Sequence, residues 1–220
     1  EPCSRRIYEQ RSIERQYGVM KSLHDLGAAP VPKMLALEPN KALFGEAFLV
    51  MERIAGDVPH DRYHAEGLLV DAAPAQRTAI WNNFIAAMAG LHRTDAKDFA
   101  FLDRPEFGAN ALEQELNIWE SYAQWLALDL TAWQQQAGQW LRDNAPRDII
   151  AGLSWGDARL PNTIFRGTEC HALLDWETVS LAGGENDLGW MLFYDWFITE
   201  AMGVERLAGV PKRDDSLQRW

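Results

Sequence analysis

Apolar residues recur at spacings of three and four between residues 12 and 27, the pattern of one face of an amphipathic helix. This stripe consists of Ile13, Tyr17, Met20, Leu23 and Leu26. Gly27 follows at a position where helices commonly end. The pattern therefore predicts a first helix that ends at Gly27.

The same periodicity predicts four more helices. The first three cover residues 74–92, about 111–126 and about 130–143. A last helix is expected to begin at Asn186 or Asp187, either of which can cap its N-terminus, and to run through the segment LGWMLFYDWFITEAMG. The tryptophans at helical spacings in the middle of the chain are expected to pack in the core; these are Trp119, Trp125, Trp133 and Trp140.

Short apolar runs predict two hairpins. Pro30 and Pro32 exclude helix and lead into a strand near residues 34–37, which a turn separates from the apolar run 47–52. Further along, the β-favouring run IIAGL starts at Ile149 and leads into the loop SWGDARLPN. Two short strands, near 163–165 and 172–174, then flank a turn at Gly167.

The composition is that of a globular protein that is expected in the cytoplasm. A chain of 220 residues, of which 47% are hydrophobic, can form one large domain or two small lobes. The only cysteines, Cys3 and Cys170, are too few for a disulfide scaffold and are not spaced as a metal site, so a reducing cytosol is expected. No apolar stretch reaches the roughly 18 residues that span a bilayer, so no membrane association is predicted.

The formal net charge of -11 argues against a general nucleic-acid binder, because such proteins hold phosphates with clustered Lys and Arg. A neutral or cationic substrate suits this charge better, although ordinary solubility also explains it. The oligomeric state is not indicated by the sequence.

Four residues within 19 positions carry the side chains that phosphoryl transfer requires: Asp157, Arg159, Asn162 and Asp175. A carboxylate near the acceptor hydroxyl, a cation on the phosphates and two oxygen ligands for magnesium make up that set. Taken singly, an Asp after Gly is commonly a turn former and an Asn after Pro a cap. The spacing D-x-R-x-x-N followed by a hairpin that returns to Asp175 favours the chemical interpretation.

Segments along nearly the whole chain resemble the aminoglycoside phosphotransferase superfamily, especially the bacterial branch similar to the kinase-like domains fused to some acyl-CoA dehydrogenases. They are ERQYGVMKSL, PVPKML, FLVMERIAG, AAMAGLHRTD, SWGDARLPN, LLDWETVSLAGGENDLGWMLF and GVERLAGVP. The resemblance implies an α+β, protein-kinase-like fold of two lobes. Residues 1–54 would form a partial N-terminal lobe with the hinge, and residues 55–220 a mainly helical catalytic lobe.

The resemblance also implies an ATP- and magnesium-dependent transfer of the γ-phosphate to a hydroxyl of a small molecule, aminoglycoside-like or another metabolite. Asp157 matches the catalytic aspartate and Arg159 the cation on the transferred phosphate. Asn162 and Asp175 match the metal ligands. The segment that resembles the family's adenine-binding hinge consists of Met51, Glu52, Arg53 and Ile54. The Glu52 carbonyl and the Ile54 amide would hydrogen-bond adenine. Asp187 matches an aspartate that braces the catalytic loop.

The chain departs from the family pattern at three places. Trp155 stands where most members have His, so the hydrogen bond of that imidazole is expected to be absent. Glu14 or Gln16 takes the position that pairs with the strand lysine. No Gly-rich loop or strand lysine precedes Glu14, so either the protein extends upstream or it does not hold ATP in the usual way.

Two alternatives to the kinase remain: a catalytically inactive pseudokinase that binds ligands, and a metal-dependent hydrolase that uses Asp157 and Asp175 directly.

Several polar residues are also assigned minor roles. Glu177 is expected to support the metal through water or to be structural, and His92 to cap its helix or bind the loop. The group His60, Asp61, His64 and Glu66 is expected to form a solvated loop. Acidic helix residues that could face an acceptor are Glu113, Glu115, Glu120 and Asp195.

Overall fold

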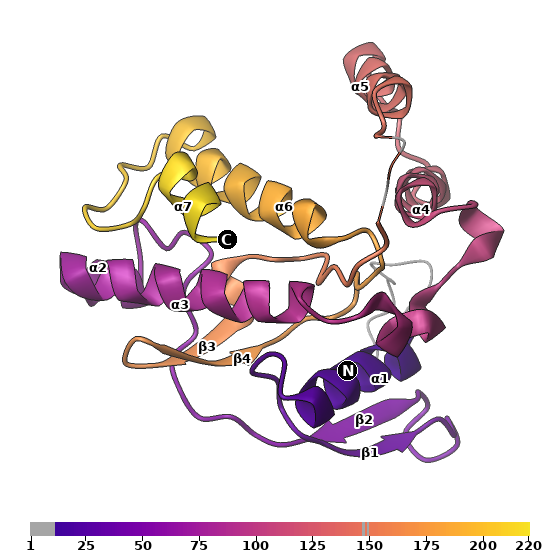
Figure 1. The fold of residues 1–220 in the computed structure, drawn as a ribbon, viewed down its shortest axis with the longest axis horizontal. Coiled ribbons are helices and arrows are strands. Elements are labelled where there is room, and N and C mark those ends of the chain that lie inside the picture. Colours follow the sequence, from indigo (N-terminus) through magenta and orange to yellow (C-terminus); the bar gives the residue numbers. More distant parts are fainter. Residues whose placement is uncertain (1–11, 147, 149) are drawn as a thin grey trace.

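The computed structural model describes residues 12–146, 148 and 150–220 (Figure 1). Cys3 and Ile149 lie outside these residues. Helix α1 covers Ile13–Leu26, as predicted. Ser12 caps it by accepting a hydrogen bond from the backbone N–H of Arg15 at 3.2 Å, and Gly27 closes it in the left-handed conformation with φ of 61°.

The first predicted hairpin is confirmed. Strand β1 (Met34–Glu38) pairs antiparallel with β2 (Phe48–Met51), and α1 packs against both. The second hairpin is also confirmed, with β3 (Thr163–Arg166) antiparallel to β4 (Glu169–Leu173). The described part of the β-favouring run, residues 150–153, forms no strand and makes only an isolated bridge between Gly152 and Ala182. Ser154, directly after the run, forms a second isolated bridge with Ser180.

Helices make up the rest of the molecule. The predicted helix over residues 74–92 is α3 (Pro74–His92), which crosses the centre of the molecule between the β3–β4 hairpin and α7 (Arg213–Arg219) (Figure 1). The other helical elements are α2 (Leu68–Asp71), α4 (Ala111–Trp125), α5 (Ala132–Asp143), α6 (Gly184–Trp196), the π-helical turn Phe197–Ala201, and the 3-10 turns Ala96–Leu102, Pro105–Phe107 and Leu160–Asn162. None of the helices in the described part is both long and apolar enough to cross a membrane.

The start of α6 differs from the prediction. The helix begins at Gly184, and neither Asn186 nor Asp187 caps it, because both side chains bond the catalytic loop instead. Gly183, with φ of 90°, occupies the N-cap position. A polar residue near a helix start therefore marked the right region but had a different role.

The prediction that four tryptophans pack in the core was wrong. Helix α5 stands apart from the main body (Figure 1), and its Trp133 and Trp140 are 67% and 62% exposed. Trp119 and Trp125 on α4 are 42% and 41% exposed. Helical spacing shows which residues share a face, but not what covers that face. The fully buried tryptophans are Trp81, Trp155 and Trp176.

A buried ionic cluster joins the loop after the first hairpin to α6. Asp195 accepts hydrogen bonds from Tyr63 Oη at 3.1 Å and His64 Nε2 at 3.0 Å, and it pairs with Arg206. His64 is 3% exposed, so the expectation of a solvated loop was wrong for this residue. Burial alone raises the pKa of Asp195, but hydrogen bonds from His64 and Arg206 outweigh it and lower that pKa.

We predict that Asp195→Asn lowers the free energy of unfolding at pH 7 by about 3 kcal/mol, because a half-buried guanidinium loses its counter-charge. The folded-state pKa of Asp195 lies below its unfolded value, so this stabilisation is present above about pH 4 and is lost as the pH falls through the folded pKa. Urea unfolding between pH 2 and 7 should show the two proteins converge in acid.

The matched control is Asp25→Asn, which removes the carboxylate of an exposed pair with Lys21. It should leave the urea midpoint unchanged at every pH. Equal effects of the two substitutions would contradict a special role for the buried cluster.

Candidate functional site

The loop that carries Asp157 is held by one buried carboxylate. Asp187, fully buried in the first turn of α6, accepts hydrogen bonds from the Ser154 hydroxyl at 2.9 Å and from the backbone N–H groups of Trp155 and Gly156 at 2.6 and 2.7 Å. Gly156 has φ of 91°, and a Cβ there would lie 2.3 Å from the Thr178 carbonyl oxygen. Only glycine fits this turn, so its position is determined by close contact as well as by Asp187.

His92 supports the same carboxylate from α3. Its Nδ1 accepts a hydrogen bond from the indole N–H of Trp220 at 2.8 Å, so Nε2 carries the proton that it donates to Asp187 at 2.8 Å. The expectation that His92 binds the loop is thus met through Asp187. The arrangement links α3, α6 and the end of α7 to one turn of the chain.

Trp155 fastens the other side of the loop. Its side chain is fully buried, and its indole N–H donates to the carbonyl oxygens of Leu174 at 2.8 Å and Asp175 at 3.2 Å. The expectation that replacing His by Trp removes a hydrogen bond was therefore incomplete, because the indole supplies one. This bond ties the loop to the segment that carries Asp175.

Both carboxylate oxygens of Asp157 are engaged. Oδ2 accepts hydrogen bonds from Arg159 Nε at 2.9 Å and Asn162 Nδ2 at 2.7 Å. Oδ1 accepts one from the indole N–H of Trp190 on α6 at 2.7 Å. Three donors from two segments therefore determine the orientation of this carboxylate.

Arg159 lies between two carboxylates. In addition to Asp157, its Nη1 donates to Asp61 Oδ1 at 2.6 Å and to the Tyr194 hydroxyl at 3.3 Å. Although partial burial alone lowers the pKa of Arg159, the Asp157 carboxylate raises it well above its usual value, so the side chain stays cationic. Asp61 belongs to the loop that was expected to be merely solvated, and it reaches the site.

Asn162 and Asp175 are brought together by the β3–β4 hairpin. The Leu174 N–H donates to the Asn162 carbonyl at 2.8 Å, which places the next residue, Asp175, beside the Asp157–Asn162 loop. Asp175 has φ of 60°, an uncommon conformation for a residue with a Cβ. Partial burial raises the pKa of its carboxyl group, and the nearby carboxylates of Glu177 and Asp157 raise it further.

This donor set suits a hard divalent cation. Nδ2 of Asn162 is bonded to Asp157, which leaves Oδ1 as the amide atom that can bind a metal. The carboxylates of Asp157 and Glu177 repel that of Asp175, and a bound cation would reduce this repulsion. Among the described residues there is no group of three or more His, Cys, Asp and Glu side chains that could hold a metal. A metal site here would therefore combine the Asn162 amide oxygen with the Asp175 carboxylate and with oxygen atoms from outside the protein.

The predicted hinge follows β2, and the chain just after it pairs with β3. The Glu52 N–H donates to the Lys33 carbonyl at 2.9 Å, and Asp57 exchanges two backbone hydrogen bonds of 2.8 Å with Phe165. Met51 and Glu52 are exposed, and Ile54 is half-buried. Adenine binding by these residues stays a prediction.

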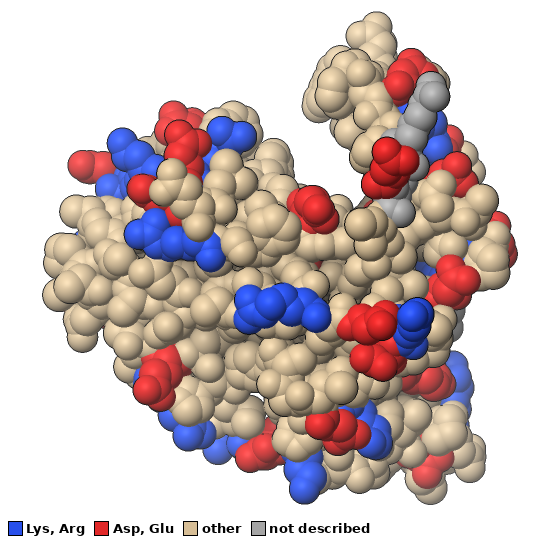
Figure 2. Space-filling view, in the orientation of Figure 1, with Lys and Arg blue, Asp and Glu red and all other residues tan. Residues whose placement is uncertain are grey.

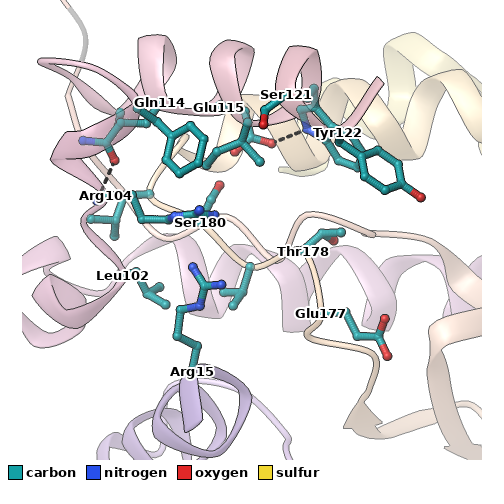
Figure 3. Close-up of a pocket in the computed structure, with 16 residues that line it drawn as sticks. Arg15, Leu102, Arg104, Gln114, Glu115, Ser121, Tyr122, Glu177, Thr178 and Ser180 are labelled. Carbon is teal, nitrogen blue, oxygen red and sulfur yellow. Dashed lines mark hydrogen bonds between the residues drawn. The ribbon is translucent and has the colours of Figure 1, made fainter. Parts of the chain in front are cut away.

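A small cavity lies beside the catalytic hairpin (Figure 3). Arg15 enters it from α1, α4 covers it, and the segment 177–181 forms a third side. Its volume of about 80 Å³ is well below the roughly 300 Å³ of sites that take a whole small-molecule substrate. Glu115 on α4 is buried here, which raises its pKa, and it accepts a hydrogen bond from the Trp119 indole at 2.7 Å.

Sequence reasoning missed Trp190 and Tyr194 as site residues. Both lie in the apolar segment LGWMLFY, where aromatic residues indicate helix packing. Their polar atoms face Asp157 and Arg159 only because α6 begins at the catalytic loop. The one available signal was the position of this helix directly after the loop segment.

Comparisons with known proteins agree with this geometry. The family described as "Phosphotransferase enzyme family" matches residues 3–210. Acyl-CoA dehydrogenase family member 11 of Rattus norvegicus is 30% identical over 212 residues, which cover 92% of this chain and 26% of the rat protein. The chain thus spans about a quarter of that relative.

Solved structures show the same fold. A candidate aminoglycoside phosphotransferase from Ralstonia eutropha aligns with a TM-score of 0.74 and 27% identity, over 94% of this chain and 64% of the other. An aminoglycoside-3'-phosphotransferase of type VIII aligns with a TM-score of 0.66 and 18% identity, over 94% and 71%. The predicted α+β, protein-kinase-like fold and the resemblance to this superfamily are confirmed.

We predict that Asp187→Asn loosens the catalytic loop. The new amide N–H groups would face the N–H of Trp155 and the proton of His92, so at least one buried donor loses its acceptor, at a cost of about 1–3 kcal/mol. Native-state hydrogen exchange at the Trp155 amide should accelerate by about tenfold or more.

The control is Glu185→Gln, an exposed carboxylate in the same turn of α6, which should leave the exchange rates unchanged. An unaltered rate at Trp155 in Asp187→Asn would show that the loop does not depend on this carboxylate.

Proposed function

Because this chain belongs to the phosphotransferase enzyme family, we propose that it transfers the γ-phosphate of ATP to a hydroxyl group of a small molecule. The observation that carries the proposal is the constellation around Asp157: an oriented carboxylate, a cationic Arg159, and the oxygen-bearing side chains of Asn162 and Asp175 at the two ends of the β3–β4 hairpin. This is the set that phosphoryl transfer requires.

In the proposed reaction Asp157 accepts the proton of the acceptor hydroxyl. The acceptor oxygen forms a bond to the γ-phosphorus, and the bond from that phosphorus to the bridging oxygen breaks, which releases ADP. The proton then passes from Asp157 to solvent. Asn162 and Arg159 hold the Asp157 carboxylate in its orientation, because both donate to Oδ2 and leave Oδ1 toward α6.

Asn162 and Asp175 would hold magnesium, which when bound neutralises charge on the phosphate oxygens. Arg159 lies within reach of the same region and would assist the transferred phosphoryl group. Met51, Glu52 and Ile54 would receive the adenine ring through the Glu52 carbonyl and the Ile54 N–H.

The metal-dependent hydrolase is less well supported. The family model that matches the chain is one of phosphotransferases, which favours transfer to an acceptor over direct hydrolysis. The inactive pseudokinase is distinguished from the enzyme by the activity measurement that follows, because it would bind ligands without ATP-dependent phosphorylation of an acceptor.

We predict that Asp157→Asn in the full-length protein lowers ATP-dependent phosphorylation of an acceptor by about a thousandfold, since the amide accepts no proton. Acceptors are found by a screen of hydroxylated metabolites and aminoglycosides for ADP release. Asp71→Asn, an exposed change on α2, should retain full activity. Equal rates for Asp157→Asn and wild type would exclude the proposed base.

A second prediction concerns the metal ligands. Asp175→Asn should raise the magnesium concentration for half-maximal activity by more than about tenfold, because a charged ligand becomes neutral. Substitution of residues that only support a metal ligand already lowers metal affinity by about tenfold or more. Titration of MgCl₂ at constant ATP measures it, again with Asp71→Asn as control. An unchanged magnesium requirement would remove Asp175 from the metal site.

A further inference from the structure

One face of α6 exposes a row of aromatic rings that begins at the catalytic carboxylate. Trp190, Phe193 and Phe197, which we call the α6 aromatic stripe, follow one another at spacings of three and four and so share a helix face. They are 37%, 47% and 41% exposed. Contiguous exposed apolar surface of this kind marks binding sites.

The rings form an ordered surface. Trp190 and Phe193 stack with centroids 5.5 Å apart and Phe193 and Phe197 with centroids 6.1 Å apart, both at an interplanar angle of 27°. Trp196, 50% exposed, lies against Phe193 at 5.9 Å. Phe197 opens a π-helical turn, a feature that recurs at functional sites. A stacked surface of this length offers about 10 Å along the helix axis.

The stripe is continuous with the reacting atoms. The indole N–H of Trp190 donates to Asp157 Oδ1 at 2.7 Å, the oxygen that Arg159 and Asn162 do not use. An acceptor hydroxyl that reaches Asp157 must therefore share or replace this indole. Figure 2 shows the surface hollowed between α6 and the α4–α5 pair.

The acidic helix residues that could receive a polycationic acceptor are already engaged in hydrogen bonds or ion pairs. Of the acidic helix residues that the sequence brings forward, Glu120 pairs with Arg142, and Asp195 with Arg206 and His64. Glu113 accepts the Ala109 N–H, and Glu115 the Trp119 indole. Glu115 and Asp195 are also buried, so neither is open to an ammonium group of an acceptor.

We propose that the phosphoryl acceptor is an alcohol with an extended apolar body, which lies on the α6 aromatic stripe and whose hydroxyl takes the place of the Trp190 indole on Asp157 Oδ1. The inference rests on the proposed function and adds the class of acceptor. Burial against the rings supplies the affinity, and the hydrogen bond to Asp157 sets the position of the hydroxyl.

The test uses 1-octanol and cyclohexanemethanol as probes, with kanamycin as the polycationic comparison, on the full-length protein with ADP and MgCl₂. Binding is followed by ligand-detected NMR, independent of any turnover. Both alcohols should bind, and Phe193→Ala should weaken them by about tenfold or more, as expected for the loss of a buried Phe surface. With ATP, KM for the alcohols should rise in the same proportion while kcat changes little.

Two further variants make the result specific. Trp190→Phe keeps the ring and removes the N–H, so alcohol affinity should be retained or increased. Phe44→Ala removes an 80% exposed ring in the β1–β2 loop and should change nothing.

The outcomes separate the two proposals. Alcohol binding that depends on Phe193 but yields no phosphate ester would overturn the proposed transfer and leave the stripe as a binding site. Phosphorylation of kanamycin alone, unaffected by Phe193→Ala, would overturn the stripe and leave the kinase. A stripe covered by a second copy or by another part of the protein would show as a change in sedimentation for Phe193→Glu with no alcohol binding, which also overturns the inference.

Discussion

The buried carboxylate of Asp187 is the interaction on which the site depends. Three donors of the catalytic loop and one of α3 converge on it, in a place where burial makes any unmet donor costly. Because Asp187 sits in the first turn of α6, the loop and the aromatic face of that helix are held as one unit. Trp155 clamps the opposite side of the loop to the carbonyl groups before and at Asp175. The relative placement of Asp157, Asn162 and Asp175 follows from these two clamps.

Much of the fold could be predicted because its signals are local. The bounds of α3 follow from Pro74 and a periodic apolar pattern, and those of α1 from Ser12 and Gly27. The hairpins follow from short apolar runs with turn residues between them. The four candidate residues Asp157, Arg159, Asn162 and Asp175 were found from type and spacing, and the structure brings them together, although their roles stay predictions.

The rest depended on long-range contacts that no local pattern encodes. The local pattern alone indicates that Asp187 is a helix cap; only the family resemblance implied that it braces the loop, whose donors lie up to 33 residues earlier. His64 reads as part of a polar loop until Asp195, 131 residues away, buries it. The tryptophans of α4 and α5 were expected in the core because the spacing cannot tell that α5 stands away from the body or that Trp119 and Trp125 of α4 lie on an exposed face. In each case the deciding partner is distant in sequence.

The charge of the protein illustrates the same limit of local reasoning. A net charge of -11 suggested a cationic or neutral partner, but charge acts on a ligand only where carboxylates face it. Several carboxylates around the site are already paired within the protein: Asp61 and Asp157 share Arg159, and Asp187 bonds the loop. What α6 offers next to Asp157 is aromatic surface. The acceptor should therefore be inferred from the groups that border the reacting oxygen, and the total charge carries little information about it.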